Sequence, residues 1–255
     1  MHSMRHIVTA AALFASAPLA FGSAEIVDNF RLTDQQGTSH ELYYLSDMKA
    51  VVLLAQGTGC DASQKAAATI EGLRAKYERQ GVTFLLLDSN LQDAASREAL
   101  AGKAKQAGIG LPILMDEAQL VGEALGITRN GEVLIANPQG WKVAYRGGVG
   151  AVPAALDSLI AGGPVKSAAS EVAGCAIKMD KQQAHASISY EKTIAPMLID
   201  KCVACHRTGG IGPWQMTNYD MTRSSIRISS RTFTSSSNDS LQKKRVAEEH
   251  SSECA

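Results

Sequence analysis

The stretch Ala50-Val-Val-Leu-Leu-Ala55-Gln-Gly-Thr-Gly-Cys60 decides the fold of the first part of this chain of 255 residues. Residues 50–55 are a continuous apolar run of strand length, which is typical of a central strand that is buried on both faces. Residues 56–60 form a loop, and from Asp61 apolar residues recur at helical spacing until the segment ends near Gly81. The sequence therefore predicts a buried strand, a short loop and a long helix that begins directly after Cys60.

The same alternation of strands and helices continues along the chain. We expect strands over 30–37, 82–87 and from 111, helices over 93–107, 120–125 and 154–159, and a hairpin of 132–136 with 142–145. This order implies an α/β fold in which helices cover both faces of one sheet. Asp88, Asp116 and Glu117 are interpreted as solvated groups at strand ends or helix caps.

The composition and the net charge limit the classes of protein to which this chain can belong. Hydrophobic residues make up 45% of the chain, which is enough for a real core in one or two domains. The 25 Lys and Arg residues balance 25 Asp and Glu residues, and no basic block precedes the C-terminal tail. Binding to nucleic acid therefore has no electrostatic support.

Residues 1–24 have the pattern of a signal peptide. Arg5 and His6 provide a positive start, residues 7–20 are mostly apolar, and Gly22-Ser-Ala24 offers small residues for cleavage. The alternative is an uncleaved anchor, but the apolar run is shorter than the roughly 20 residues of a membrane span. We expect a periplasmic or otherwise exported bacterial protein that has no membrane span after cleavage and lies in an oxidising compartment.

The motif Cys202-Val-Ala-Cys205-His206 has the C-x-x-C-H spacing by which a c-type haem is attached. Two thiols on one turn can form thioethers with the two vinyl groups of one porphyrin, and the adjacent imidazole then becomes the proximal iron ligand. We expect one covalent haem c per chain, held by Cys202 and Cys205, with iron bound by His206. The alternatives are a Cys-X-X-Cys dithiol and half of a zinc site, for which His185, Cys175 and Cys254 are only scattered candidates.

The chain divides into regions of different composition. We expect a first domain over 25–163, a loose linker rich in small residues over 164–187, and a mainly α-helical haem-binding module over 188–221. Residues 222–255 are rich in Ser and lack apolar periodicity, so we predict a disordered tail. We further hypothesise that this tail is read in a non-native frame, which leaves the haem module incomplete.

Several segments carry a family resemblance. The strand and loop over 50–60, Ser89-Asn-Leu91, Leu111-Pro-Ile-Leu-Met-Asp-Glu117 and Asn137-Pro138 with Tyr145-Arg-Gly147 occur in the order of peroxiredoxin-like redoxins of the thioredoxin superfamily. The chain resembles these proteins over nearly all of residues 25–163. The resemblance implies a thioredoxin-like fold with a central mixed sheet flanked by helices, and thiol-dependent peroxide reduction or thiol–disulfide exchange.

In such redoxins the attacking cysteine lies at the start of the first long helix, the place of Cys60. Helix N-terminal amides stabilise a thiolate there and lower its pKa. A sulfenic acid on Cys60 would need a resolving thiol, for which Cys175 is the obvious candidate. Arg129 or Arg146 could match the activating arginine of peroxiredoxins, and Thr58 stands one position from their threonine. The alternative is that Cys60 is a small, inert core residue.

Residues 188–221 resemble cytochrome-like modules that follow redoxin domains in exported bacterial proteins, some of which continue into a copper type II, ascorbate-dependent monooxygenase-like region. The copper-binding His and Met clusters of that region do not occur in this sequence. A Met sulfur is the usual second axial ligand of an electron-transfer haem. Met216 and Met221 are candidates for it, with Met197 as a third.

We therefore predict an exported redox protein in which a redoxin domain, reacting through Cys60, is joined to a haem module for electron transfer. Its partner would be a redox protein or a small-molecule electron donor. One alternative is an electron-transfer or scaffold protein with an inert redoxin domain. Another is a thiol–disulfide oxidoreductase that uses Cys202 and Cys205 as a dithiol.

Overall fold

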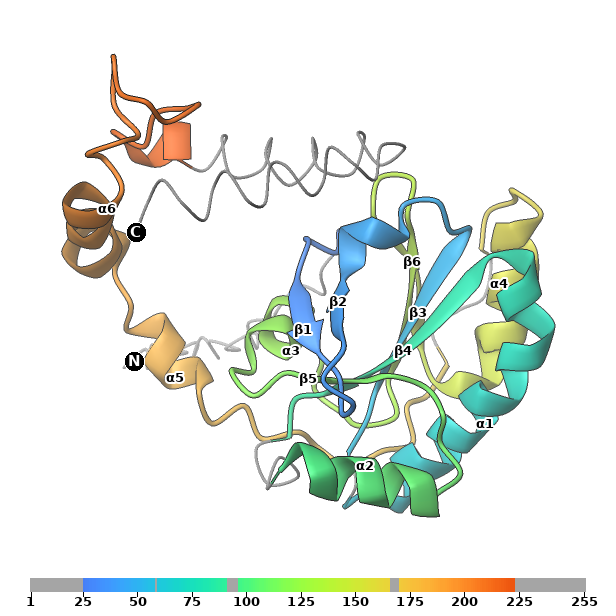
Figure 1. Ribbon diagram of the computed structural model, residues 1–255. Helices are drawn as coiled ribbons and strands as arrows, with labels where there is room; N and C mark the ends of the chain where they lie inside the picture. Colours follow the sequence, from blue (N-terminus) through green and yellow to red (C-terminus); the bar gives the residue numbers. More distant parts are fainter. Residues whose placement is uncertain (1–24, 58, 91–95, 166–169, 223–255) are drawn as a thin grey trace, which may run out of the picture.

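A five-stranded mixed sheet forms the centre of the first domain (Figure 1). The computed structural model describes residues 25–57, 59–90, 96–165 and 170–222. The strand order is β5 (Ile113–Met115), β4 (Val82–Asp88), β3 (Ala50–Ala55), β6 (Val133–Asn137) and β7 (Lys142–Gly147). Strands β3, β4 and β5 run parallel, whereas β6 is antiparallel to both β3 and β7. The predicted buried strand at 50–55 is thus confirmed as the central one.

Alternate residues of β3 point to opposite faces of the sheet and build two hydrophobic clusters. Val52 and Leu54 pack with α1 (Asp61–Tyr77), α2 (Arg97–Gln106) and α4 (Val152–Ile160). On the other face, Val51 and Leu53 pack with the short helices η1 (Leu42–Leu45) and α3 (Leu120–Ala124). Helices therefore cover both faces, as the alternating pattern predicts.

The small elements of the domain complete the second face. Strands β1 (Arg31–Thr33) and β2 (Ser39–Glu41) form a separate antiparallel hairpin that leads into η1. Next to it, the rings of Tyr43 and Trp141 stack with their centroids 4.8 Å apart. The predicted hairpin at 132–145 is confirmed as β6 and β7. The helix expected over 93–107 begins at Arg97, where the Ser96 hydroxyl accepts a hydrogen bond from the Ala99 N–H and caps it.

Two carboxylates expected in solvent are buried. Asp88 is 6% exposed and Asp116 is 1% exposed. The Asp116 carboxylate accepts hydrogen bonds from the Ser89 hydroxyl and from the N–H of Gly122 at the start of α3. The prediction of a helix cap is therefore right for Asp116, but the prediction of solvation is wrong because its partners surround it.

Residues 170–185, which we call the strap, lie along the first domain. Ala176 pairs with Arg129 in an isolated antiparallel bridge, and the Ile177 N–H donates to the Thr128 carbonyl. The strap ends in α5 (Gln182–Ala186), where His185 Nδ1 lies 2.6 Å from a Glu123 carboxylate oxygen. This part of the expected linker is held against the domain, which differs from the loose conformation predicted from its small residues.

The last described part, residues 188–222, contains little regular structure. It consists of the π-helical turn η4 (Tyr190–Ile194), α6 (Ala195–Lys201) and irregular turns. Only Thr222 of these residues is buried, whereas apolar side chains such as Met197 and Ile211 are 52% and 78% exposed. In the described part of the chain, no helix is long and apolar enough to cross a membrane. The expected signal peptide (1–24) and all but the first residue of the expected tail (222–255) lie outside the described residues.

We predict that Leu53→Ala lowers the free energy of unfolding by about 2–5 kcal/mol, because Leu53 is fully buried in the central strand and the truncation leaves a cavity. Urea denaturation followed by circular dichroism would measure this loss. Leu120→Ala is the matched control, since Leu120 is 54% exposed. Equal losses in both variants would contradict this packing.

Candidate functional site

Cys60 lies between the central strand and the long helix, at the N-cap of α1. Its backbone is extended, with φ −126° and ψ 104°, and its carbonyl accepts the first helical hydrogen bond from Gln64. Only 2% of the residue is exposed. The order strand, loop, cysteine and helix predicted from residues 50–61 is confirmed.

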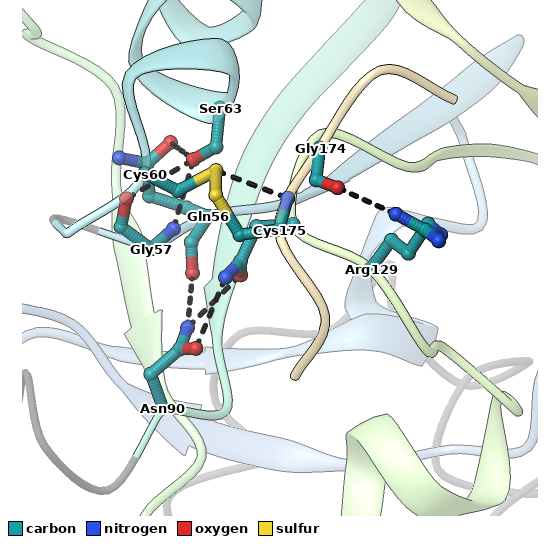
Figure 2. The surroundings of a disulfide bond; sticks show 9 residues. Gln56, Gly57, Cys60, Ser63, Asn90, Arg129, Gly174 and Cys175 are labelled. Carbon is teal, nitrogen blue, oxygen red and sulfur yellow. Dashed lines mark hydrogen bonds between the residues drawn. A yellow bond between two sulfur atoms is a disulfide. The ribbon is translucent and has the colours of Figure 1, made fainter. Parts of the chain in front are cut away.

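The structure joins Cys60 to Cys175 by a disulfide bond across 115 residues of sequence, with the two Cα atoms 5.9 Å apart. Cys175 is on the strap, and its backbone N–H also donates a hydrogen bond to Cys60 Sγ at 3.1 Å (Figure 2). The two cysteines predicted as attacking and resolving thiols are therefore brought together.

A network of polar side chains holds the loop before Cys60. The Ser63 hydroxyl accepts a hydrogen bond from the Gly57 N–H at 2.9 Å and lies 3.1 Å from the Gln56 side-chain oxygen. The Ser63 hydroxyl therefore orders the loop. The Asn90 amide donates to the Gln56 carbonyl at 2.8 Å and exchanges hydrogen bonds with the Asn130 amide. Thr58, the weak candidate within this loop, lies outside the described residues.

Two glycines allow the backbone to approach this network closely. A Cβ added at Gly57 would lie 2.5 to 2.8 Å from the side-chain amide of Asn130. A Cβ added at Gly174 would lie 1.6 Å from the Asn130 carbonyl oxygen. Any larger residue at 174 would therefore push the strap away from the loop that carries Asn130.

The two candidate arginines make contacts with the strap and with neighbouring loops. Arg129 Nη1 donates to the Gly174 carbonyl at 2.7 Å, so its guanidinium fixes the strap next to Cys175 (Figure 2). Arg146 pairs with Glu132 at 2.6 Å and donates to the Leu125 carbonyl. Among the contacts given by the described residues, neither guanidinium meets the Cys60 sulfur.

The C-x-x-C-H motif forms a tight turn at the end of α6. The Cys202 carbonyl accepts hydrogen bonds from the N–H groups of Cys205 and His206, at 3.2 and 2.9 Å. Both cysteines are half-buried, and their thiols are free. His206 Nδ1 lies 2.9 Å from the Trp214 carbonyl, which can only accept, so Nδ1 carries a proton; the lone pair of a neutral imidazole is then on Nε2.

The residues after the motif wrap closely around His206. A Cβ added at Gly212 would lie 2.6 Å from His206 Nδ1, and one at Gly210 would lie 2.3 Å from the Cys205 carbonyl oxygen. The indole Nε1 of Trp214 is buried and has no hydrogen-bond partner. A prosthetic group with polar substituents would offer that N–H an acceptor. A free imidazole Nε2, two free thiols and this donor fit a covalently bound haem.

The candidate distal ligands are placed less favourably. The Met216 N–H donates to the His206 carbonyl at 2.9 Å, which holds Met216 beside His206. Met221 is 39% exposed, and its sulfur accepts from the Thr217 hydroxyl at 3.6 Å. Met197 is exposed on α6. In the described residues, no group of three or more His, Cys, Asp or Glu side chains is placed to hold a metal ion.

Part of the site was not anticipated. The sequence predicts no role for Asn90, Asn130 or Gly174 and no order in the strap. The signal for Gly174 is its position directly before Cys175, since glycine permits a close backbone approach. The two asparagines are ordinary loop residues in the sequence, and only the fold brings them together.

The mixed sheet, the cysteine at the start of α1 and its pairing with a second cysteine define a thioredoxin-like redoxin. Residues 24–149 match the model of the AhpC/TSA family.

Two solved structures share the fold, and a third is less similar. A hypothetical protein from Sinorhizobium meliloti 1021 is 20% identical, with a TM-score of 0.56 over 62% of this chain and 95% of its own. An uncharacterized conserved protein from Geobacillus kaustophilus is 25% identical, with a TM-score of 0.52 over 63% of this chain and 93% of its own. A peroxidoxin from Mycobacterium tuberculosis is 19% identical, with a TM-score of 0.46 over 55% of this chain and 96% of its own. A search of curated proteins finds no match to the chain.

We predict that reducing the Cys60–Cys175 disulfide lowers the free energy of unfolding by about 2–4 kcal/mol, because the bond closes a long loop in the unfolded chain. Urea denaturation with and without a thiol reductant would measure the change. The Cys175→Ser variant is the control and should not respond to the reductant. Identical midpoints for the oxidised and reduced wild-type protein would show that this bond does not form.

Proposed function

We propose that this chain is an exported redox protein in which a peroxide-reducing thiol site, Cys60 with Cys175, is joined to a covalent c-type haem that transfers electrons. The observation that carries the thiol chemistry is the disulfide between these two cysteines at the start of α1. The haem proposal is supported by the arrangement of Cys202, Cys205 and His206 and by the surroundings of that turn.

The first chemical step uses Cys60 as a nucleophile. Its thiolate attacks one oxygen of the peroxide, the O–O bond breaks, and the departing oxygen takes a proton to leave as water or an alcohol. Cys60 becomes a sulfenic acid and the peroxide has gained two electrons. The position of Cys60 at the N-terminus of a 17-residue helix supports this role, because the helix amides stabilise the thiolate.

The second step uses Cys175. Its thiol sulfur attacks the Cys60 sulfenic sulfur, the S–O bond breaks and water leaves, which gives the disulfide seen in the structure. A dithiol donor from outside the chain then returns two electrons by thiol–disulfide exchange.

Burial of the site favours a small oxidising substrate. Cys60 is 2% exposed, and the strap lies over it. A protein disulfide cannot reach the Cys60 sulfur without displacing the strap, whereas hydrogen peroxide or a small alkyl peroxide has the size to enter. We therefore favour peroxide reduction over disulfide exchange with a large protein as the reaction of Cys60.

In the second region, Cys202 and Cys205 would form the thioether bonds and His206 Nε2 would bind the iron. When bound, the haem supplies a one-electron couple. The hydrogen bond from His206 Nδ1 to the Trp214 carbonyl fixes the tautomer and orientation that an axial ligand needs. The glycines at 210 and 212 let the chain pass close to the motif without collision.

The exposure of apolar side chains in residues 188–222 also supports a bound haem, which would form the core of this region. Segments of this size rarely bury enough apolar surface to fold alone and usually depend on a metal, a cofactor or disulfides. Here Met197, Ile199 and Ile211 are 52%, 67% and 78% exposed. A porphyrin would cover apolar side chains of this kind.

Export is supported by chemistry at both sites. The predicted signal peptide at residues 1–24 would deliver the chain to an oxidising compartment, where the Cys60–Cys175 disulfide persists. Covalent haem attachment takes place outside the bacterial cytoplasm as well. The redox partner would be a second protein or a small electron donor.

We predict that Cys60→Ser abolishes thiol-dependent peroxide consumption, because the hydroxyl is a far weaker nucleophile than a thiolate. Consumption of hydrogen peroxide with a dithiol donor in excess would measure it. Cys175→Ser should still reduce one equivalent of peroxide but accumulate the Cys60 sulfenic acid. Turnover by Cys60→Ser at the wild-type rate would refute the peroxide proposal.

We predict that the exported chain stains for haem peroxidase activity on a denaturing gel and shows a Soret band. The Cys202→Ser, Cys205→Ser double variant should lose the stain, because no thioether remains. Cys60→Ser is the matched control and should keep it. An exported sample without a Soret band, in which Cys202 and Cys205 react with an alkylating agent, would instead favour the dithiol alternative.

A further inference from the structure

We propose that the strap is a working part of the thiol site: it stays on the domain when the disulfide opens, and the Cys175 amide N–H donates to the Cys60 thiolate. This inference rests on the proposed thiol chemistry of Cys60 and names a positioning device for it. The strap comprises residues 170–185 and contacts the domain on both sides of Cys175 (Figure 1).

Contacts before Cys175 hold the start of the strap without help from the disulfide. The Gly148 N–H donates to the Ser170 hydroxyl at 2.9 Å, and the Tyr145 hydroxyl lies 2.8 Å from the same oxygen. A Cβ added at Gly148 would lie 2.4 Å from the Glu171 carbonyl oxygen, so the two backbones touch. This end of the strap is fitted to the end of β7.

Contacts after Cys175 are equally independent of the sulfur–sulfur bond. The Gln119 amide donates to the Lys178 carbonyl at 2.7 Å, and its oxygen accepts from the Lys181 N–H at 3.0 Å. Ile177 packs against the hydrophobic cluster on this face of the sheet. His185 then pairs with Glu123 at 2.6 Å. Opening one covalent bond in the middle therefore leaves the strap anchored at both ends.

The middle of the strap fixes the Cys175 amide. The Asn130 N–H donates to the Cys175 carbonyl at 2.9 Å, and Arg129 holds the Gly174 carbonyl at 2.7 Å. These bonds restrain the peptide unit between Gly174 and Cys175, whose N–H lies 3.1 Å from Cys60 Sγ (Figure 2). The donor is a backbone N–H, so replacing the Cys175 side chain does not remove it.

The Cys60 sulfur needs such a donor. Burial disfavours the charged form of a thiol and raises its pKa, whereas hydrogen bonds to the thiolate lower it. At 2% exposure, water provides little of that stabilisation for Cys60. Cys60 makes no side-chain capping hydrogen bond to α1, so the Cys175 amide is the donor that the described residues place on this sulfur, and the docked strap keeps the resolving thiol within reach.

The test measures the pKa of Cys60 in two reduced variants of the full chain. Cys175→Ser keeps the amide, and Cys175→Ser with Gly174→Ala displaces it, since a Cβ at 174 collides with the Asn130 carbonyl. The rate of iodoacetamide alkylation against pH, followed by mass spectrometry of the Cys60 peptide, gives the pKa as the midpoint. Altered access to the sulfur changes the plateau rate and not the midpoint.

We expect the midpoint to rise by about 1–2 pH units when Gly174→Ala is added, as for loss of one hydrogen bond to a charged group. Gly150→Ala in the same background is the matched control, because a Cβ there meets nothing within 4 Å. Amide hydrogen exchange should show residues 170–181 protected in reduced Cys175→Ser, and the protection around position 175 should be lost after Gly174→Ala.

Three results would overturn the proposal: equal midpoints, a strap already unprotected in reduced Cys175→Ser, or unchanged protection around position 175 after Gly174→Ala. If Gly174→Ala unfolds the domain, Ser170→Ala with His185→Ala loosens both ends and should shift the midpoint in the same direction. No peroxide is used, so failure here is separate from failure of the peroxide assay with Cys60→Ser.

Discussion

The close approach of the strap to the loop between α3 and β6 is the contact on which the thiol site depends. Gly174 passes so near the Asn130 carbonyl that a single added carbon would collide with it. This proximity places Cys175 against Cys60. It also positions the Cys175 N–H to donate to Cys60 Sγ and the Cys175 carbonyl to accept from the Asn130 N–H. The sheet positions Cys60, but the second half of the site comes from a segment outside the family-matched region of residues 24–149.

Features that rest on local interactions can be predicted from the sequence, whereas features that rest on contacts between distant residues cannot. The strand at 50–55, the helix from Asp61 and the hairpin around residues 137–140 rest on local periodicity and turn residues, and all three are confirmed. Cys60 could be identified because its place between strand and helix is also local. The burial of Asp116 could not, since its partners Ser89 and Gly122 approach only in the folded sheet.

The order of the strap is still harder to predict from the sequence. Its composition of small residues is typical of a flexible linker, and no apolar period marks it as structured. Its order comes from backbone pairing with Thr128 and Asn130 and from side chains such as Gln119, all distant in sequence. Small residues are favourable here because they let two backbones meet, so the composition that suggested a linker is what allows the docking.

The two candidate redox sites therefore differ in how they are built. The turn of Cys202, Cys205 and His206 is made within a few residues, and its neighbours Gly212 and Trp214 follow at once in the sequence. The thiol site joins segments 115 residues apart. The strap is anchored at His185, through Glu123 of α3, as well as at Cys175. In the proposed cycle, the segment that carries the C-x-x-C-H motif therefore keeps this attachment to α3 while the thiols change their redox state.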